Sequence, residues 1–269
     1  MLTAHLPVTR DLTPAYGISL VTALLMAGAS VAGLLFPTAL YPAEALRQSF
    51  VTNDIVSLFI GLPLLLGAMA LTRRVKLLGL LFWPGALFYV TYNSLAYAAA
   101  RLSIWLFAVH LVLVALSGYA IVRLIVGIDG ATVQQRLAGA VAERLAGGVL
   151  AGLGGLFFLR AVGLLMTAMV NRTSLPAAEL GVLLADLLTA PVWVVGGVAL
   201  WRKHSFGYVT GAGLLFQASM LFVGLLMFFL LQPWLAGTPF PAVDFVVVLA
   251  MGMICFVPLG LFVRGIVSR

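Results

Sequence analysis

The sequence predicts an all-α, polytopic transmembrane helical bundle of about eight spans, and three observations support this prediction. Hydrophobic residues form 63% of the 269-residue chain and charged residues only 9%, and the mean hydropathy is +1.17. Soluble domains average about 45–50% apolar and 25% charged residues. The apolar residues also occur in runs of about 20, the length that a helix needs to cross the hydrocarbon core. Membrane lipid is therefore the expected surrounding of this chain.

Eight apolar stretches each have the length and composition of a membrane-crossing helix. Their bounds are roughly 16–36, 52–72, 77–99, 102–126, 148–170, 176–201, 207–231 and 242–265. No strong basic region precedes the first stretch, so we interpret it as a retained helix and not as a cleaved signal peptide. Together these stretches leave little chain for a soluble domain.

Basic residues are distributed unequally between the two sides of these spans, which predicts the orientation of the chain. With eight spans, both termini share one side with the second, fourth and sixth loops. That side carries Arg10, Arg73, Arg74, Lys76, Arg123, Arg136, Arg144, Arg202, Lys203, Arg264 and Arg269. The opposite side carries only Arg47, Arg101 and Arg172. Because Lys and Arg concentrate in cytoplasmic loops, both termini should be cytoplasmic.

This distribution also explains the net charge of +7. In a soluble protein such a charge would suggest nucleic acid. Here the basic residues occupy positions typical of topology signals, so no nucleic-acid partner is expected. The preference for Arg over Lys, with abundant Ala, Leu and Gly, is typical of a GC-rich bacterial genome. We therefore expect the bacterial inner (plasma) membrane as the location.

The longest predicted cytoplasmic connection, 127–147, divides the chain into an N-terminal half, 1–126, and a C-terminal half, 148–269, with four spans each. Apolar residues recur at four-residue spacing between Ala131 and Ala146, which predicts a short amphipathic helix lying on the membrane. Its expected role is to connect the halves, and a partner-binding role is the alternative.

The two halves have similar layouts. Pro42–Leu46 precedes the second span and Pro176–Leu180 opens the sixth, and each is followed by an acidic residue, Asp54 or Asp186. A duplication of four spans would give two parallel four-helix repeats related by an axis along the membrane normal. Chance similarity between Leu- and Ala-rich helices is the competing explanation.

Arg160 is the basic residue that belongs to neither side, since it lies near the centre of the fifth span. A guanidinium there costs about 3 kcal/mol on insertion scales, so it should face the bundle and have a partner. Asp186 lies about ten residues into the sixth span and is the most deeply placed acid, with Glu179 two turns before it on the same face. We therefore predict an ion pair between Arg160 and Asp186, which is either a functional site or a contact that sets helix register.

Other polar residues fall in the half of the membrane opposite the termini. Tyr89, Asn93 and Tyr97 form a stripe at four-residue steps on the third span, and His110 lies in the fourth. For Tyr97, at the outer end of this stripe, an ordinary interfacial aromatic residue is the alternative interpretation. Tyr89, Asn93 and His110 join Asp54, Glu179, Arg160 and Asp186 in one set of polar residues. This set predicts an outward-opening polar cavity around Arg160 and Asp186. A buried His is more often a helix-packing residue than a ligand, so this interpretation of His110 also stays open.

Several functions are excluded or disfavoured. No Gly-x-x-x-x-Gly-Lys-Ser/Thr loop, His-Glu-x-x-His or Gly-x-Ser-x-Gly motif occurs in the chain. The single cysteine, Cys255, provides no redox pair, and with three histidines no haem or zinc site is expected. We therefore predict no cofactor and no metal.

Three functions remain. The leading hypothesis is a transporter or permease for a small solute, anionic given Arg160, with Asp54 or Asp186 as a proton-coupling carboxylate. The first alternative is an enzyme acting on a lipid or isoprenoid, in which Asp54, Asp186 and His110 perform acid–base chemistry. The second is a structural or assembly subunit that binds other membrane subunits.

Overall fold

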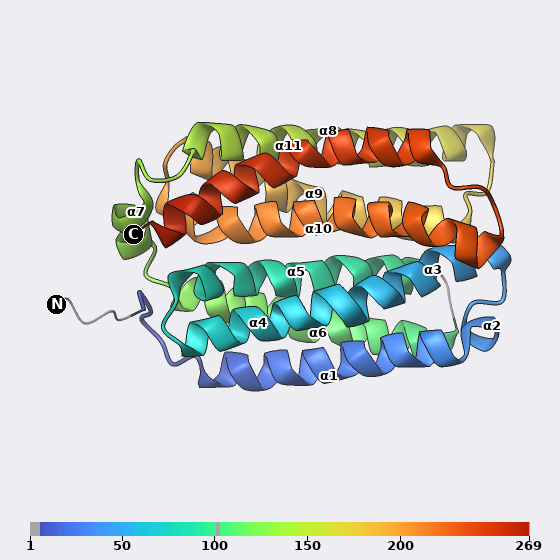
Figure 1. The fold of residues 1–269 in the computed structure, drawn as a ribbon, viewed down its shortest axis with the longest axis horizontal. Coiled ribbons are helices and arrows are strands. Elements are labelled where there is room, and N and C mark those ends of the chain that lie inside the picture. The colour runs from blue at the N-terminus through green and yellow to red at the C-terminus, as the bar shows by residue number, and fades with distance from the viewer. Residues whose placement is uncertain (1–5, 101–102, 269) are drawn as a thin grey trace.

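A computed structural model describes residues 6–100 and 103–268, and its elements within these ranges are helices (Figure 1). Arg101 and Arg269, two of the basic residues used to predict orientation, lie outside the described residues. The elements are α1 (Thr13–Leu35), α2 (Pro37–Leu40), α3 (Glu44–Val56), the π-helical turn η1 (Ser57–Gly61), α4 (Leu62–Arg73), α5 (Leu77–Ala99), α6 (Ile104–Gly127), α7 (Gly130–Leu137), α8 (Glu143–Asn171), α9 (Ala177–Trp201), α10 (Ser205–Ala236) and α11 (Ala242–Val267).

The predicted all-α membrane bundle is confirmed. Within the described residues, seven helices are long and apolar enough to cross a membrane, with α3, η1 and α4 together forming one of them, Glu44–Arg73. The remaining predicted span, the third at 77–99, corresponds to α5, a 23-residue helix that is absent from those seven. Most of α5 is buried against its neighbours, including polar side chains such as Tyr89 and Tyr92. A helix enclosed by protein does not need the continuous apolar surface of one that faces lipid.

Several helices extend beyond the predicted apolar stretches. The second membrane helix begins at Glu44, α8 begins at Glu143, and α10 continues to Ala236. Hydropathy marks only the part of a helix that lies in hydrocarbon. The additional turns carry polar or interfacial residues, so the sequence pattern places the helix ends too close to the membrane centre.

The helices before and after α7 form two groups that lie against each other (Figure 1). One group contains α1, α3, α4, α5 and α6, and the other contains α8, α9, α10 and α11. Helices α5 and α10 cross where Gly85 meets Gly213, and a Cβ atom on Gly85 would overlap the backbone of Gly213. Glycine thus allows the two groups to approach at backbone distance. The predicted parallel repeat remains a prediction.

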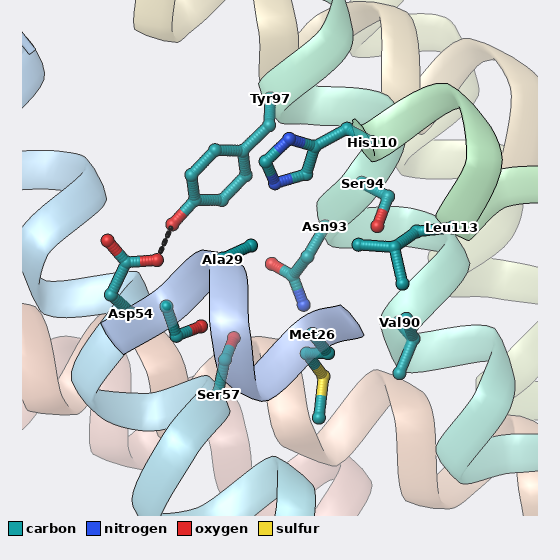
Figure 2. A pocket seen from close by; sticks show the side chains of 11 residues that line it. Met26, Ala29, Asp54, Ser57, Val90, Asn93, Ser94, Tyr97, His110 and Leu113 are labelled. Atoms are coloured by element: carbon teal, nitrogen blue, oxygen red, sulfur yellow. Dashed lines mark hydrogen bonds between the residues drawn. The ribbon is translucent and has the colours of Figure 1, made fainter. Parts of the chain in front are cut away.

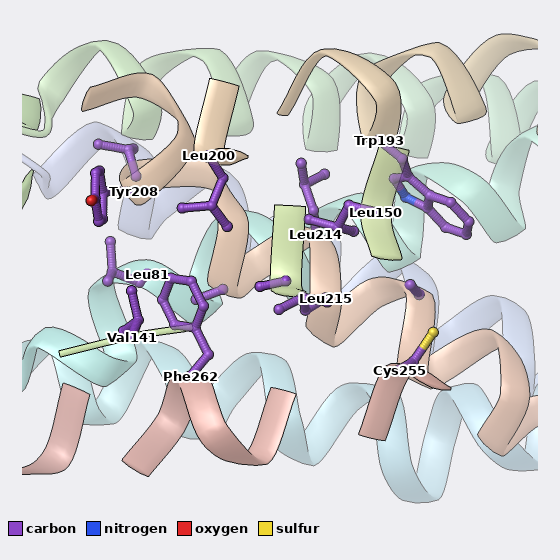
Figure 3. Close-up of a cluster of buried hydrophobic side chains, with 14 of the residues drawn as sticks. Leu81, Val141, Leu150, Trp193, Leu200, Tyr208, Leu214, Leu215, Cys255 and Phe262 are labelled. Atoms are coloured by element: carbon purple, nitrogen blue, oxygen red, sulfur yellow. The ribbon is translucent and has the colours of Figure 1, made fainter. Parts of the chain in front are cut away.

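A hydrophobic cluster joins the C-terminal helices to α5 (Figure 3). Its members include Leu81 of α5, Leu150 of α8, Trp193 of α9, Leu215 of α10 and Phe262 of α11. All five residues are buried. Cys255 of α11 belongs to the same cluster and is buried as well. Apolar packing therefore holds α5 against the second group of helices.

The described segment before α1 and the end of α11 lie at one end of the bundle, which we call the terminal end, and the opposite end is the distal end (Figure 1). The backbone N–H of Asp129 donates to Pro7 O and that of Thr9 donates to Gly127 O, each at 2.8 Å. Near the other terminus, Gly265 of α11 lies against the backbone of Ala140. The predicted cytoplasmic side corresponds to the terminal end.

The predicted amphipathic helix between Ala131 and Ala146 is shorter than expected. Helix α7 covers eight residues, Gly130–Leu137, and buries Val133 and Leu137. Gly139 then adopts a φ of 72°, a left-handed conformation that ends the helix. The residues after Ala142 already belong to α8.

Candidate functional site

The polar centre of the first group of helices is Asp54, which α3 places one turn before the π-helical turn. Its side chain is buried, with the residue 3% exposed. Tyr41 donates a hydrogen bond to Oδ2 and Tyr97 donates one to Oδ1, each at 2.8 Å. Within the described residues, no salt bridge to Asp54 is formed. Two hydroxyl groups therefore solvate this carboxylate in place of a cation from the described part of the chain.

Glycine on α1 makes room for this carboxylate. A Cβ atom on Gly33 would overlap Oδ2 of Asp54 and would lie 2.6 Å from the Tyr41 hydroxyl. Helix α1 can therefore pass directly beside the Asp54–Tyr41 pair only because position 33 lacks a side chain. The backbone of α1 forms one wall of the site.

A polar cavity adjoins Asp54 (Figure 2). Its volume is about 20 Å³, which is sufficient for a water molecule. The lining residues come from α1, α3, η1, α5 and α6 and are Met26, Ala29, Ser30, Asp54, Ser57, Val90, Asn93, Ser94, Tyr97, His110 and Leu113. Hydroxyl, amide, imidazole and carboxylate groups thus meet in one small space between membrane helices.

His110 lies beside the ring of Tyr97, with Asp54 at the hydroxyl of the same tyrosine (Figure 2). The two rings are stacked, with centroids 4.4 Å apart and planes 7° apart. Nδ1 of His110 lies 2.8 Å from Leu106 O, so this nitrogen carries a proton and donates it to the carbonyl. In a neutral imidazole Nε2 is then an acceptor, available to a proton donor or a water molecule in the cavity.

A π-helical turn, η1, follows Asp54 and contributes Ser57 to the cavity wall. The turn is closed by a wide backbone bond from Leu62 N to Ser57 O. Pro63 follows directly and has no N–H to donate to Phe59 O, the carbonyl four residues earlier. Ser57 Oγ lies 3.3 Å from the Tyr89 hydroxyl, and Gly61 leaves space for the Tyr89 ring. Such π-helical turns occur frequently at functional sites.

The second buried carboxylate, Asp186 of α9, lies between the two groups of helices. Tyr92 of α5 donates a hydrogen bond of 2.8 Å to its Oδ1. Arg160 of α8 places Nη1 3.5 Å from its Oδ2. The Asp186 side chain is 2% exposed and that of Arg160 is 48% exposed. The structure therefore brings Arg160 and Asp186 together, with the guanidinium reaching inward from the surface of α8.

The outward-opening cavity predicted around Arg160 and Asp186 remains a prediction. The cavity beside Asp54 is a different one, which neither of these two residues lines. Arg160 occupies a half-exposed face of α8, from which its long side chain extends to a single buried oxygen. Glu179 lies in the first turn of α9 and does not line the cavity either.

The remaining predicted site residues belong to the Asp54 region. Asn93 and His110 line the cavity, and Tyr89 contacts Ser57 in its wall. Sequence reasoning misses Tyr41, which lies outside every predicted span. Tyr97, for which the sequence leaves a place in the polar stripe or at the interface, is buried and donates a hydrogen bond to Asp54. The helical spacing of Tyr97 with Asn93 and Tyr89 is the sequence signal that places it on the same helix face as these two residues.

Within the described residues, no three His, Cys, Asp or Glu side chains are placed to hold a metal ion together. No protein-family model, curated protein or solved structure matches this chain. The fold and the site therefore define its class directly: a polytopic α-helical membrane protein in which the buried carboxylates Asp54 and Asp186 lie within membrane helices.

Proposed function

We propose that this protein is a proton-coupled transporter of a small solute, with Asp54 as the proton-binding carboxylate. The observation that supports this most strongly is that Asp54 is buried, pairs with no cation of the described residues and adjoins a polar cavity. An ionised carboxylate is costly to hold in a membrane interior, whereas a protonated one is far less so. Proton binding therefore changes the energy of this site substantially.

The neighbouring groups suit proton exchange at Asp54. In the ionised state the carboxylate accepts hydrogen bonds from Tyr41 and Tyr97. When protonated, it becomes a donor, and one of those hydroxyls must turn away or accept. His110 lines the same cavity with Nε2 available as an acceptor, and the cavity has room for a bridging water. We infer that protons pass between Asp54 and His110 through a water molecule bound in this cavity.

The solute route in this proposal lies between the two groups of helices, where Tyr92 meets Asp186. This hydrogen bond joins α5 to α9, and Arg160 extends the contact to α8. Asp186 Oδ2 accepts no hydrogen bond from the described residues, and the guanidinium pairs with it only at 3.5 Å. An anionic solute could compete with Asp186 for Arg160, which supports an anion as the substrate. Alternate exposure of this contact would open a path on either side.

The size of the cavity favours transport over the lipid-modifying enzyme. A volume of about 20 Å³ holds water and not a lipid headgroup. In addition, Asp186 lies outside the cavity that contains Asp54 and His110, so the three residues do not form one acid–base centre. Positive-inside topology places the terminal end in the cytoplasm in this proposal.

Reconstitution into liposomes that contain a pH-sensitive dye tests the proposal. A panel of small organic anions should produce solute-dependent proton uptake in the natural protein. Asp54→Asn removes the titratable group while keeping the size of the side chain, and should abolish this uptake. Asp244→Asn, in the exposed first turn of α11, is the matched control and should leave uptake unchanged. Equal uptake by well-folded Asp54→Asn protein, or no uptake with any anion, would contradict the proposal.

A further inference from the structure

A groove lies at the terminal end of the bundle, far along the helices from the distal loops. Its walls are the last turns of α9, the turn Arg202–Ser205 and Gln134 of α7. Its volume is about 710 Å³. The groove contributes nothing to the Asp54 cavity, and the proposed transport cycle does not use it.

The lining of this groove changes from apolar to basic along the helix axis. Val194, Val195 and Val198 form the part within α9, and Val195 is 59% exposed. Arg202, Lys203 and His204 form the rim. At a rise of about 1.5 Å per residue, Val194 and Arg202 are separated by about 12 Å along the helix. The groove therefore spans the boundary between hydrocarbon and headgroups if α9 crosses the membrane as its length and composition indicate.

Among the described residues, Lys203 at the rim interacts electrostatically with the carboxylate of Glu143 but forms no salt bridge with it. Among those residues, Arg202 and Lys203 form no salt bridge. The nearby carboxylate of Glu143 is buried and accepts bonds from Gly139 N at 2.8 Å and from the Tyr208 hydroxyl at 3.0 Å. It does not line the groove. Arg202 and Lys203 are thus not tied up in salt bridges of the described residues, and both can contact an anionic group at headgroup level.

The rim is also held in a fixed conformation. Gln134 Nε2 of α7 donates a hydrogen bond of 2.8 Å to Lys203 O. Lys203 has a φ of 57°, and the next residue, His204, donates its backbone N–H to Ala199 O at 2.8 Å. Nδ1 of His204 accepts from Phe206 N at 3.3 Å, which leaves Nε2–H of the neutral ring as a donor. A pre-arranged set of donors binds an anion with less loss of entropy.

We propose that this groove binds one anionic phospholipid. Its phosphate contacts Arg202 and Lys203, and the upper part of an acyl chain lies along Val194, Val195 and Val198. Basic pockets beside membrane helices at the cytoplasmic side commonly bind anionic headgroups. Such a lipid would contact both α9 and α7 and would fasten the short helix to the bundle.

Native mass spectrometry of the detergent-solubilised protein tests this site. The protein is titrated separately with phosphatidylglycerol, which is anionic, and with phosphatidylcholine, which has the same acyl chains and no net charge. We expect preferential binding of one phosphatidylglycerol. Lys203→Gly suits the left-handed backbone and Arg202→Gln retains a polar side chain, so the turn should persist. Each change should weaken phosphatidylglycerol binding about 5-fold, since a basic residue near anionic lipid contributes about 1 kcal/mol.

Arg74→Gln with Lys76→Gln is the matched control, because these exposed residues lie in another basic turn outside the groove. It should leave the preference unchanged. Equal weakening by the control pair would show diffuse attraction and overturn the proposal, as would equal binding of both lipids. Inorganic phosphate that displaces phosphatidylglycerol at millimolar concentration would indicate a free-anion site instead. If Lys203→Gly lowers the melting temperature, Arg202→Gln alone decides the outcome.

Discussion

At the scale of single residues, the Asp54 site depends on groups that hold a carboxylate without neutralising it. Tyr41 and Tyr97 each donate one hydrogen bond of 2.8 Å to it. Gly33 supplies the space in which Oδ2 lies. A tyrosine hydroxyl stabilises the ionised carboxylate less than a guanidinium would, so the site retains its ability to bind a proton. Asp186 accepts a hydrogen bond from a tyrosine and also pairs with an arginine, so its ionised form is stabilised more strongly than that of Asp54.

Gly33→Ala should disturb the site directly. The added methyl group would overlap Asp54 Oδ2 and force the carboxylate or α1 to move. Overpacking of this kind costs about 1–3 kcal/mol. Gly28→Ala on the same helix is the control, since its methyl group would meet no described atom within 4 Å apart from its chain neighbours and the adjacent backbone of its own helix, and alanine favours helix. Unfolding by SDS in mixed micelles would measure both, and equal stability of the two variants would contradict the close packing at Gly33.

Tyr97→Phe should weaken the same site by removing one hydroxyl while keeping the ring that stacks on His110. A hydrogen bond to a charged group contributes about 1.5–3 kcal/mol, so we expect a loss of that size if Asp54 is ionised. Tyr119→Phe, on a tyrosine that is 54% exposed, should have little effect. The same unfolding assay applies. A loss confined to high pH would show that the hydroxyl acts on the ionised carboxylate.

At the scale of helices, periodicity and length predict the membrane elements because lipid constrains each span separately. Contacts between spans are harder to predict. Tyr41 lies 13 residues from Asp54 in the sequence and Tyr97 lies 43 residues from it. The three residues meet only because α3 packs against α5 and against the segment between α2 and α3. The end of α7 is also missed, since apolar spacing continues past Gly139 although the backbone there has a positive φ. The Arg160–Asp186 contact is easier to predict from the sequence, because few partners exist for a charge inside a span.

Helix α7 provides a prediction about pH. Asp129 caps the helix by accepting bonds from Thr132 Oγ1 and from the backbone N–H groups of Ala131 and Thr132. The Thr132 hydroxyl, followed by the backbone donors, lowers the pKa of Asp129 below its ordinary value of 3.8. A lowered pKa means that the cap stabilises the helix above the unfolded-state pKa and is lost as the pH falls through the folded-state value.

Amide hydrogen exchange over Gly130–Leu137, expressed as protection factors, measures this effect. Protection of α7 should decrease as the pH falls below 3.8 in the natural protein. Asp129→Asn also caps a helix but does not titrate, so its protection should be nearly independent of pH. Asp129→Ala should show weak protection at every pH. Parallel pH profiles for the natural protein and Asp129→Asn would show that another group controls the helix.

At the scale of the whole molecule, α5 connects both carboxylate sites. Its Tyr97 binds Asp54 in the first group of helices, and its Tyr92 binds Asp186 in the second. The same helix crosses α10 at Gly85 and Gly213. A movement of α5 would therefore change the surroundings of both acids together. This arrangement supports a coupling between proton binding at Asp54 and the contact between the two groups.

The contact between the groups can be tested by a double-mutant cycle at Arg160 and Asp186. Arg160→Leu leaves the nearly fully buried Asp186 without its cation, whereas Asp186→Asn leaves a guanidinium that is 48% exposed. Arg160→Leu should therefore destabilise the protein more than Asp186→Asn, because an unpaired buried charge is the costlier defect. The double variant should recover part of the loss, with a coupling of about 0.5–3 kcal/mol in SDS unfolding. Strictly additive losses would mean that the two side chains do not interact. The polar contact at Asp186 between the two groups would then depend on the Tyr92 hydrogen bond alone.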